Sequence, residues 1–220
     1  NVSTTGFRAD FEQSRSMGVY YGDGQPTRAY AMTESPRADF TSGPMIQTNN
    51  PLDAAIQGDG FFAVQAPDGT EAYTRAGNFA VDAAGVLRTA NGLAVLGDGG
   101  LITIPENEKV QIGADGTISI IGQGQGPEAM VEVGRIRLVN PDVLALEKGD
   151  DGLFRQRDGL NALPAAEVTL RSGMLEGSNV NAIDEFTQIM SLARQYEMQV
   201  KLMKTADENT AASSQLLQMS

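Results

Sequence analysis

Apolar or small side chains recur along the end of this chain at alternating spacings of four and three, the heptad pattern of a coiled-coil helix. They are Ala182, Phe186, Ile189, Ala193, Tyr196, Val200 and Met203, then Asp207, Thr210, Ser214 and Leu217. At about 1.5 Å per residue, a helix over 181–217 would be roughly 55 Å long, more than a compact domain needs. Because we find no second helical pattern in the sequence, we expect the partner helix to come from another chain or from a segment outside this sequence.

The start of this helix also has a sequence signature. Asn181 is a favourable N-cap, with Asp184 and Glu185 in the first turn. An alternative is that a long amphipathic helix simply packs on its own β-domain, but the length and the strict heptad favour helix–helix association. We predict that Phe186, Ile189, Ala193, Tyr196, Val200 and Met203 form the helix–helix interface.

Residues 51–177 have a different pattern, in which short β-type runs are separated by Gly, Asp and Asn. Short strands at this spacing are typical of an all-β sandwich or barrel. The alternation over 131–138 changes phase at Gly134, where we expect a β-bulge. Strands are predicted at 61–65, 72–74, 79–81, 86–89, 93–96, 102–104, 110–112, 117–121, 131–138, 168–170 and 174–175.

Residues 1–50 are polar and irregular, with turn signals at 22–26 and 42–44 and one candidate strand at 28–33. We expect this stretch to lie extended along another part of the molecule. The predicted organisation is an extended N-terminal segment (1–50), a compact all-β central domain (51–177) and a coiled-coil helix (178–220). The predicted fold class is therefore mainly β with one long C-terminal α-helix.

Composition excludes several functions. The net charge of −12 and the absence of Lys/Arg clusters argue against nucleic acid as a partner. Without Cys or His the chain has no thiol nucleophile, no disulfide, and neither the commonest general base nor the commonest transition-metal ligand. There is no apolar run of about 18 residues, so we predict no membrane-spanning segment.

Three features invite a chemical interpretation, and each has a plainer one. The glycine-rich run at 122–126 fits neither the dinucleotide nor the P-loop spacing, so a β–β loop is favoured. Residues 149–152, GDDG, lack the closing Glu of a calcium loop, so a tight turn is favoured. No carboxylate pair is distinguishable from the acidic background. We therefore predict no catalytic residue, cofactor or metal, and no enzyme activity.

Three groups of residues, in order along nearly the whole chain, resemble the rod and hook family of bacterial flagellar axial proteins. Residues 1–8, NVSTTGFR, match its N-x-x-T-x-G-F-K/R signature, and 178–181, SNVN, match the signature that opens its C-terminal helix. Residues 56–62, 72–79 and 84–87 resemble its central β-domain. On this resemblance, the predicted assembly-motif residues are Asn1, Thr4, Gly6, Phe7, Arg8, Asn179 and Asn181.

Within the family, the sequence is most similar to proximal-rod members. Residues 149–155, GDDGLFR, together with 175–179, 205–209 and 215–220, carry this likeness. The short segment between the first motif and the β-domain also favours a proximal over a distal rod subunit. Another axial subunit, of the distal rod or hook, remains an alternative. A periplasmic protein that binds or cleaves the cell wall is a remote one, and it would need two convergent carboxylates in a cleft.

The resemblance implies a structural role. A family member would assemble with copies of itself and with other rod proteins into a tube that crosses the periplasm and transmits torque. It would be exported through the flagellar type III apparatus. The family has a helix of about thirty residues ahead of the first motif that this sequence lacks, which implies that the C-terminal helix packs mainly on neighbouring subunits. Gly6 is expected to permit a backbone bend, and Phe7 to anchor the junction against the helix.

Overall fold

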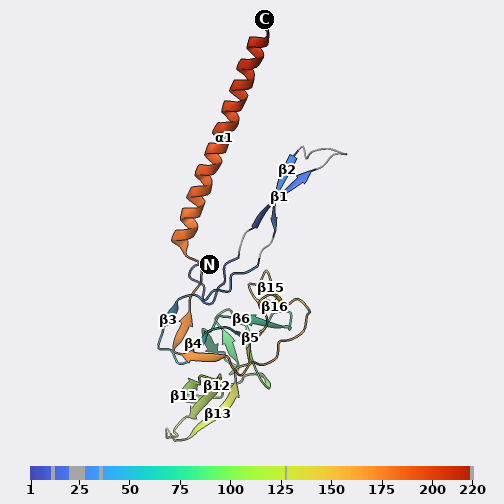
Figure 1. The fold of residues 1–220 in the computed structure, drawn as a ribbon. Coiled ribbons are helices and arrows are strands. Elements are labelled where there is room, and N and C mark those ends of the chain that lie inside the picture. Colours follow the sequence, from blue (N-terminus) through green and yellow to red (C-terminus); the bar gives the residue numbers. More distant parts are fainter. Residues whose placement is uncertain (11–12, 20–27, 35–36, 127, 219–220) are drawn as a thin grey trace. The chain divides into compact units, whose positions relative to one another are not determined.

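A computed structural model describes the backbone of residues 1–10, 13–19, 28–34, 37–126 and 128–218. It describes the side chains of 1–10, 37–126 and 128–209. The chain divides into two compact units, Asn1–Val180 and Asn181–Ser220. The first unit contains the described strands and the second is one long helix, so the fold is mainly β with a C-terminal helix, as predicted (Figure 1).

The centre of the first unit is an antiparallel sheet with the strand order β15-β16-β6-β5-β9-β8-β7, in which β10 also pairs with β9 and β14 with β5. Strands with turns between them repeat along 54–156, and most connections are hairpins, as the Gly, Asp and Asn spacing predicts. The strands are β5 (Phe61–Gln65), β6 (Glu71–Thr74), β7 (Phe79–Val81), β8 (Leu87–Thr89), β9 (Ala94–Gly97), β10 (Gly100–Leu101), β14 (Leu138–Val139), β15 (Leu146–Lys148) and β16 (Phe154–Gln156).

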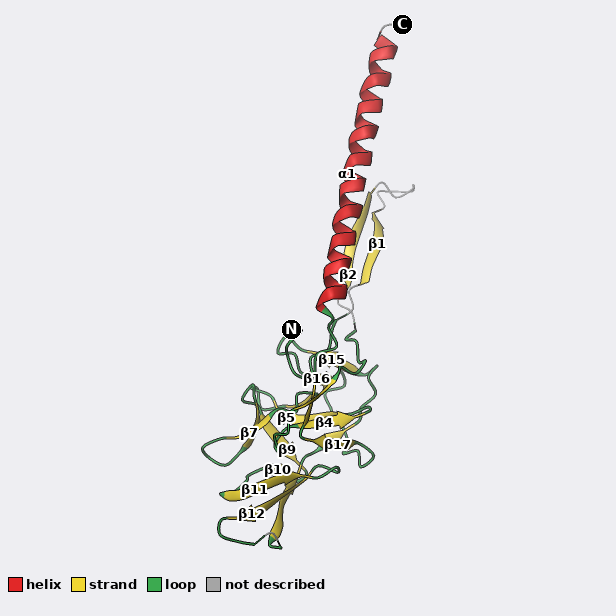
Figure 2. Ribbon diagram, turned by 90° about the vertical axis from the view of Figure 1, so that its left-hand side faces the viewer, coloured by secondary structure: helices red, strands yellow, loops and turns green. Residues whose placement is uncertain are grey.

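Smaller sheets surround this one. A three-stranded sheet, β11 (Asn107–Ile112), β12 (Thr117–Gly122) and β13 (Met130–Arg135), lies at the lower end of the first unit in Figure 2. Two ladders pair distant parts of the chain: β4 (Ala54–Gln57) with β17 (Thr169–Ser172), and β3 (Met45–Gln47) with β18 (Met174–Glu176). β1 (Gln13–Val19) pairs with β2 (Arg28–Glu34). The segment before the β-domain is therefore paired with the segment that precedes the helix.

The largest apolar cluster lies where the central sheet, the three-stranded sheet and β4–β17 meet. Its most deeply buried side chains include Ile56, Phe62, Leu87, Val95 and Ile118. A second cluster contains Phe61, Tyr73, Val139 and Phe154, against which Phe40 packs. This second cluster ties residues from the N-terminal segment to the central sheet.

Most of the predicted strands are confirmed, including β5, β7 and β12, and the bulge expected at Gly134 lies at Val133–Gly134, opposite Ile118 and Ser119. The strand predicted at 102–104 is wrong, because Thr103 makes only an isolated bridge to Val86. The loop at 122–126 and the turn at 149–152 are confirmed. The turn predicted at 22–26 lies outside the described residues.

The predicted strand at 28–33 is confirmed as β2, while β1 was not predicted. Its residues, QSRSMGV, show no regular alternation of polar and apolar side chains. Short strands β3, β4, β10, β15 and β16 were also missed, because runs of two to four residues carry little periodicity of their own.

Aspartates stabilise several of the turns. Asp82 and Asp115 each accept hydrogen bonds from backbone N–H groups within their own turn, and Asp82 also accepts one from Arg88 Nε at 2.6 Å. The side-chain bond from Arg88 lowers the pKa of Asp82, and the hydroxyl of Thr117 lowers the pKa of Asp115. These interactions stabilise the charged form of both carboxylates in the folded chain.

Because the folded pKa values lie below the unfolded ones, this stabilisation is present above the unfolded pKa and lost as pH falls through the folded pKa. We expect the free energy of unfolding to be nearly constant from pH 7 to about pH 5 and to fall below about pH 4. Urea unfolding between pH 6 and pH 3 measures this. The Asp82→Asn and Asp115→Asn double variant should show a shallower fall, and an identical slope would contradict the assignment.

The second unit is α1 (Ala182–Gln218), a helix of 37 residues. The predicted N-cap is confirmed: Asn181 Oδ1 accepts a hydrogen bond from Ile183 N at 3.0 Å, and Asn181 Nδ2 donates to Asp184 Oδ2 at 2.7 Å. Among the described residues, no helix combines the length and the apolarity needed to cross a membrane.

Candidate assembly site

The predicted motif at the start of the chain folds against β18, which precedes the helix in sequence. Gly6 has a positive φ of 66°, the conformation that the expected bend requires, and its N–H donates to the Glu176 carbonyl at 2.8 Å. A Cβ at this position would overlap the backbone of Arg75. Gly6 is therefore needed for both its dihedral angle and its lack of a side chain.

Next to this bend, one buried carboxylate is shared by two buried arginines. Arg8 Nη2 donates to Glu176 Oε1 at 2.6 Å, and Arg75 Nη1 donates to Oε2 at 3.2 Å. The side chains of Arg8 and Glu176 have no exposed surface, and that of Arg75 is 3% exposed. Burial lowers the pKa of Arg75, and the charge of Glu176 opposes this. The three residues join the N-terminal motif, the central β-region and β18.

The arginines are held by further contacts. Arg75 Nη2 donates to the Gly58 carbonyl at 2.6 Å, and the guanidinium lies 5.4 Å from the centre of the Phe61 ring. Arg8 has Nε and Nη1 buried without a hydrogen-bond partner. Glu176 is thus the only described carboxylate in an ion pair with either arginine.

Asn179 connects three segments by hydrogen bonds. Its Oδ1 accepts from Ala9 N at 2.7 Å, and its Nδ2 donates to the carbonyls of Asp39 and Thr41 at 2.9 and 3.2 Å. The Asn179 N–H donates to the Phe7 carbonyl at 3.3 Å. The side-chain amide is used as both donor and acceptor, which explains why an amide and not a carboxylate occupies this position.

The sequence analysis marked Gly43 only as part of a turn signal at 42–44, and the structure has no turn there. Gly43 instead belongs to the junction, the contact region between the N-terminal motif and β18. Its N–H donates to Glu176 Oε1 at 3.0 Å, and a Cβ here would overlap the Gly177 carbonyl. The neighbouring Gly177 N–H donates to the Pro44 carbonyl at 2.8 Å. The backbone of 43–44 therefore lies directly against β18 and its following residue.

Gly6→Ala is expected to lower the free energy of unfolding of the first unit by at least about 1–3 kcal/mol, since the positive φ alone costs that much and the methyl group also overlaps backbone. Gly99→Ala is the matched control, because a methyl group at this position would have no other atom within 4 Å. Urea denaturation of both variants measures the difference. Equal free energies of unfolding for the two variants would contradict this expectation, since they would show that the backbone around residue 6 accommodates a methyl group without loss of stability.

Lys148 contacts the N-terminal motif at one side of the junction. Its Nζ donates to the Arg8 carbonyl at 2.8 Å and to both carboxylate oxygens of Asp10 at 2.9 Å, and it lies 4.3 Å from the centre of the Phe7 ring. The ring of Phe7 thus contacts Lys148. The anchoring of Phe7 against the helix remains a prediction.

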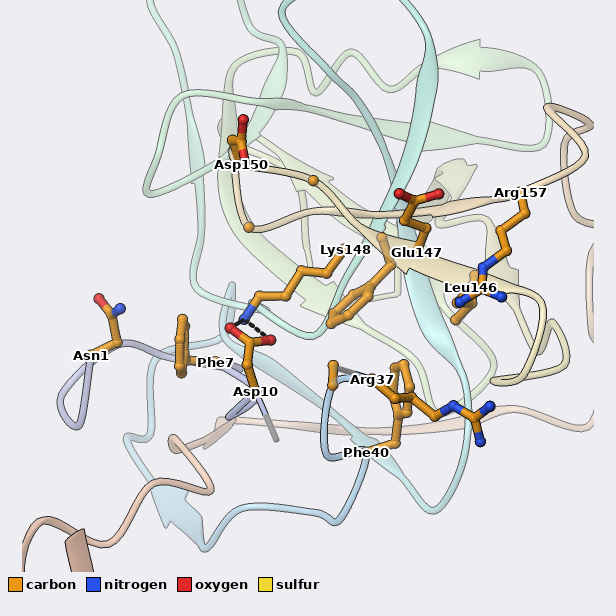
Figure 3. Close-up of a pocket in the computed structure, with 14 residues that line it drawn as sticks. Asn1, Phe7, Asp10, Arg37, Phe40, Leu146, Glu147, Lys148, Asp150 and Arg157 are labelled. Atoms are coloured by element: carbon orange, nitrogen blue, oxygen red, sulfur yellow. Dashed lines mark hydrogen bonds and ion pairs between the residues drawn. The ribbon is translucent and has the colours of Figure 1, made fainter. Parts of the chain in front are cut away.

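A groove of about 690 Å³ opens beside this ion pair (Figure 3). We call it the junction groove. The larger apolar residues of its lining are Phe7, Phe40, Leu146 and Phe154, and the charged residues along it include Arg37, Glu147, Asp150 and Arg157. Among the described residues no group of His, Cys, Asp or Glu side chains is placed to hold a metal ion.

The seam residues of the helix are exposed where their side chains are described. Phe186 is 67% exposed, Ile189 60%, Tyr196 68% and Met203 60%, and Val200 is 38% exposed. Ala193 is exposed as well. The side chains of Thr210, Ser214 and Leu217 lie outside the described residues. Exposed apolar side chains of this size are typical of association surfaces, and the helix–helix interface stays a prediction.

The structure brings Gly6, Phe7, Arg8 and Asn179 together at the junction. Asn1 and Thr4 lie at the exposed start, where the Thr4 N–H donates to the Asn1 carbonyl at 3.1 Å. Sequence reasoning missed Arg75, Glu176, Lys148 and Gly43. Arg75 and Glu176 lie within stretches that resemble the family. The signal that could have identified them is a charged residue next to apolar strand positions.

Comparison with protein-family models gives two matches. Residues 55–120 match the flagellar hook protein FlgE/F/G D1 domain, and residues 171–216 match the flagellar basal body rod FlgEFG protein C-terminal region. The first match covers much of the central sheet, and the second covers the end of β17, all of β18 and most of the helix.

The FlgF relatives align along nearly the whole chain. Flagellar basal-body rod protein FlgF of Salmonella typhimurium is 42% identical over 226 residues, covering 100% of this chain and 89% of the relative. FlgF of Caulobacter vibrioides is 37% identical, covering 97% and 84%. FlgG of Bacillus subtilis is 38% identical over 73% of this chain and 63% of its own length. The chain therefore belongs to the FlgF family of flagellar basal-body rod proteins.

Proposed function

We propose that this chain is a structural subunit of the proximal part of the flagellar basal-body rod. The observation that carries this proposal is the exposed heptad seam of α1, whose large side chains have no reason to face water unless other helices cover them. The full-length similarity to FlgF proteins supports the rod as the assembly. Copies of this chain and other rod proteins supply the covering helices.

The role is mechanical and not enzymatic. A subunit that transmits torque needs its β-domain fixed to its helix, and the junction of Gly6, Arg8, Arg75, Glu176 and Asn179 ties the segment that precedes α1 to the N-terminal motif and the β-domain. In this proposal 1–50 and 51–177 form the outer part and 178–220 the core of a tube in the periplasm. Export through the flagellar type III apparatus precedes assembly.

Complementation tests the proposal. The chain, joined to the N-terminal helix of a related proximal-rod protein, is produced in a bacterium whose own FlgF gene is deleted. We expect motility to return and the chain to co-purify with basal bodies. A chain that restores motility in a strain lacking FlgG instead would contradict the proximal assignment, and recovery in neither strain would contradict a rod role.

A further inference from the structure

The first ten residues, which we call the N-terminal strap, are held to the rest of the molecule mainly by polar contacts. Among the described residues, the three buried apolar clusters include none from the strap. Figure 3 shows one of its contacts, Asp10 directed at the Lys148 ammonium. Others are the bonds from Gly6 N to the Glu176 carbonyl, from Arg8 to the Glu176 carboxylate, from Ala9 N to Asn179 Oδ1, from Asn179 N to the Phe7 carbonyl and from Asp39 N to the Ala9 carbonyl. Because such bonds replace bonds to water, they add less net stability than buried apolar surface does.

The strap also brings an excess of positive charge into the junction. Arg8 and Arg75 are both buried and share the single carboxylate of Glu176, so the closed junction contains two cations and one anion. Asp59, whose charge also acts on Arg75, is exposed to solvent. If the strap leaves, Arg75 and Glu176 remain as a balanced pair, and the Glu176 carboxylate keeps its bond from Gly43 N. Because excess buried charge is unfavourable, part of the cost of detaching the strap is recovered.

Arg8 is also the less well satisfied of the two arginines. Its Nε and Nη1 are buried without a hydrogen-bond partner, whereas Arg75 lacks a partner only at Nε. Arg75 is held from the β-region as well, by the Gly58 carbonyl and by the ring of Phe61. A guanidinium group that moves into water regains its missing hydrogen bonds. Detachment of the strap therefore relieves Arg8 and leaves Arg75 in place.

We propose that the N-terminal strap is a latch, which opens as one unit while the β-region stays folded. Opening removes the bonds that Asn179 makes to Phe7 and Ala9, and Asn179 lies just before the N-cap of α1. The closed latch fixes the segment that precedes α1 to the strap. The open latch leaves this segment held by the β3–β18 ladder and by the Arg75–Glu176 pair. The device lies within a single chain and does not rest on the proposed function.

Amide hydrogen exchange of the full chain in dilute solution, at rising urea concentrations below the unfolding transition, tests the latch. The reporter amides are those that bond across the strap, namely Gly6, Ala9, Asp39 and Asn179. The reference amides bond within the β-region, namely Ala63, Leu87 and Ile104. We expect the reporters to share one opening constant, at least about 100-fold larger than that of the references and only weakly dependent on urea, because little surface is exposed. Reporters that open only with the references, at the same constant and urea dependence, would overturn the proposal.

Two variants show whether the strap is a separate unit. Ile118→Val removes a methylene group from the largest apolar cluster, which stays packed when the latch is open. It should raise the opening constant of the references by roughly 2–10-fold and leave the reporters unchanged.

Lys148→Met removes contacts that exist only in the closed latch, so it should raise the opening constant of the reporters by at least about threefold. Lys109→Met, at an exposed position on β11, is its control and should change neither set. If Ile118→Val raised both sets equally, or if Lys148→Met left the reporters like the control does, the strap would not be a latch. The rod function would be unaffected by that result, because the measurement concerns a single chain.

Discussion

Glu176→Gln is expected to lower the free energy of unfolding of the first unit by about 3–5 kcal/mol, since it removes the carboxylate that is ion-paired with two buried guanidinium groups. Arg8 and Arg75 have no other ion-pair partner among the described residues. Glutamine keeps the shape of glutamate, so the loss reports the charge and not a cavity. Urea unfolding at pH 7 measures it.

Asp151→Asn is the control for this experiment. Its carboxylate pairs with Arg155 at 2.7 Å, but both side chains are about one-third exposed, at 32% and 30%. A partly exposed pair contributes about 0–1 kcal/mol, so this variant should lose little. If Glu176→Gln lost no more than the control, the buried network would not be what holds the N-terminal motif against β18.

Tyr196→Asp is expected to abolish association of the chain while leaving the β-domain folded. Tyr196 is exposed in the single chain, so the substitution disturbs no packing there, but it places an unpaired charge inside any helix–helix seam. We expect the dissociation constant to rise by at least about 100-fold, which is about 2.7 kcal/mol. Sedimentation measures association, and thermal unfolding checks the β-domain.

Gln195→Asp provides the matched control for Tyr196→Asp. It adds the same charge one residue earlier, about 100° around the helix and away from the seam. This variant should associate like the parent chain and should be incorporated into rods. If Gln195→Asp and Tyr196→Asp were equally defective, general charge and not the seam would govern assembly.

The sequence predicts the helix, its N-cap at Asn181 and the bulge at Gly134 because each depends on residues close together in the chain. The junction depends on residues far apart. Arg8 and Glu176 are 168 positions apart, and the side chain of Asn179 contacts residues 138–170 positions away. Neither periodicity nor spacing indicates which distant residues pair. The motif at residues 1–8 was therefore identified by its resemblance to the family, and the junction residues Arg75 and Glu176 were identified only from the structure.

Glycine positions show the same division. Turn glycines such as Gly69 and Gly92 have positive φ and lie in hairpins that local sequence predicts. Gly43 has no unusual φ, and it is required because the backbone of Gly177 lies against it. A requirement imposed by another segment leaves no local signal, which is why sequence analysis marked Gly43 only as part of a turn and not as a contact of Gly177.

The most direct test of the account is amide hydrogen exchange of residues 182–209 in the isolated chain and in purified basal bodies that contain it. If the seam is covered by helices of other subunits, these amides exchange quickly in the isolated chain, at rates set by local helix opening, and become strongly protected in the rod. Strong protection already present in a monomeric chain would mean that the seam is satisfied internally, and it would contradict the assembly role proposed for α1.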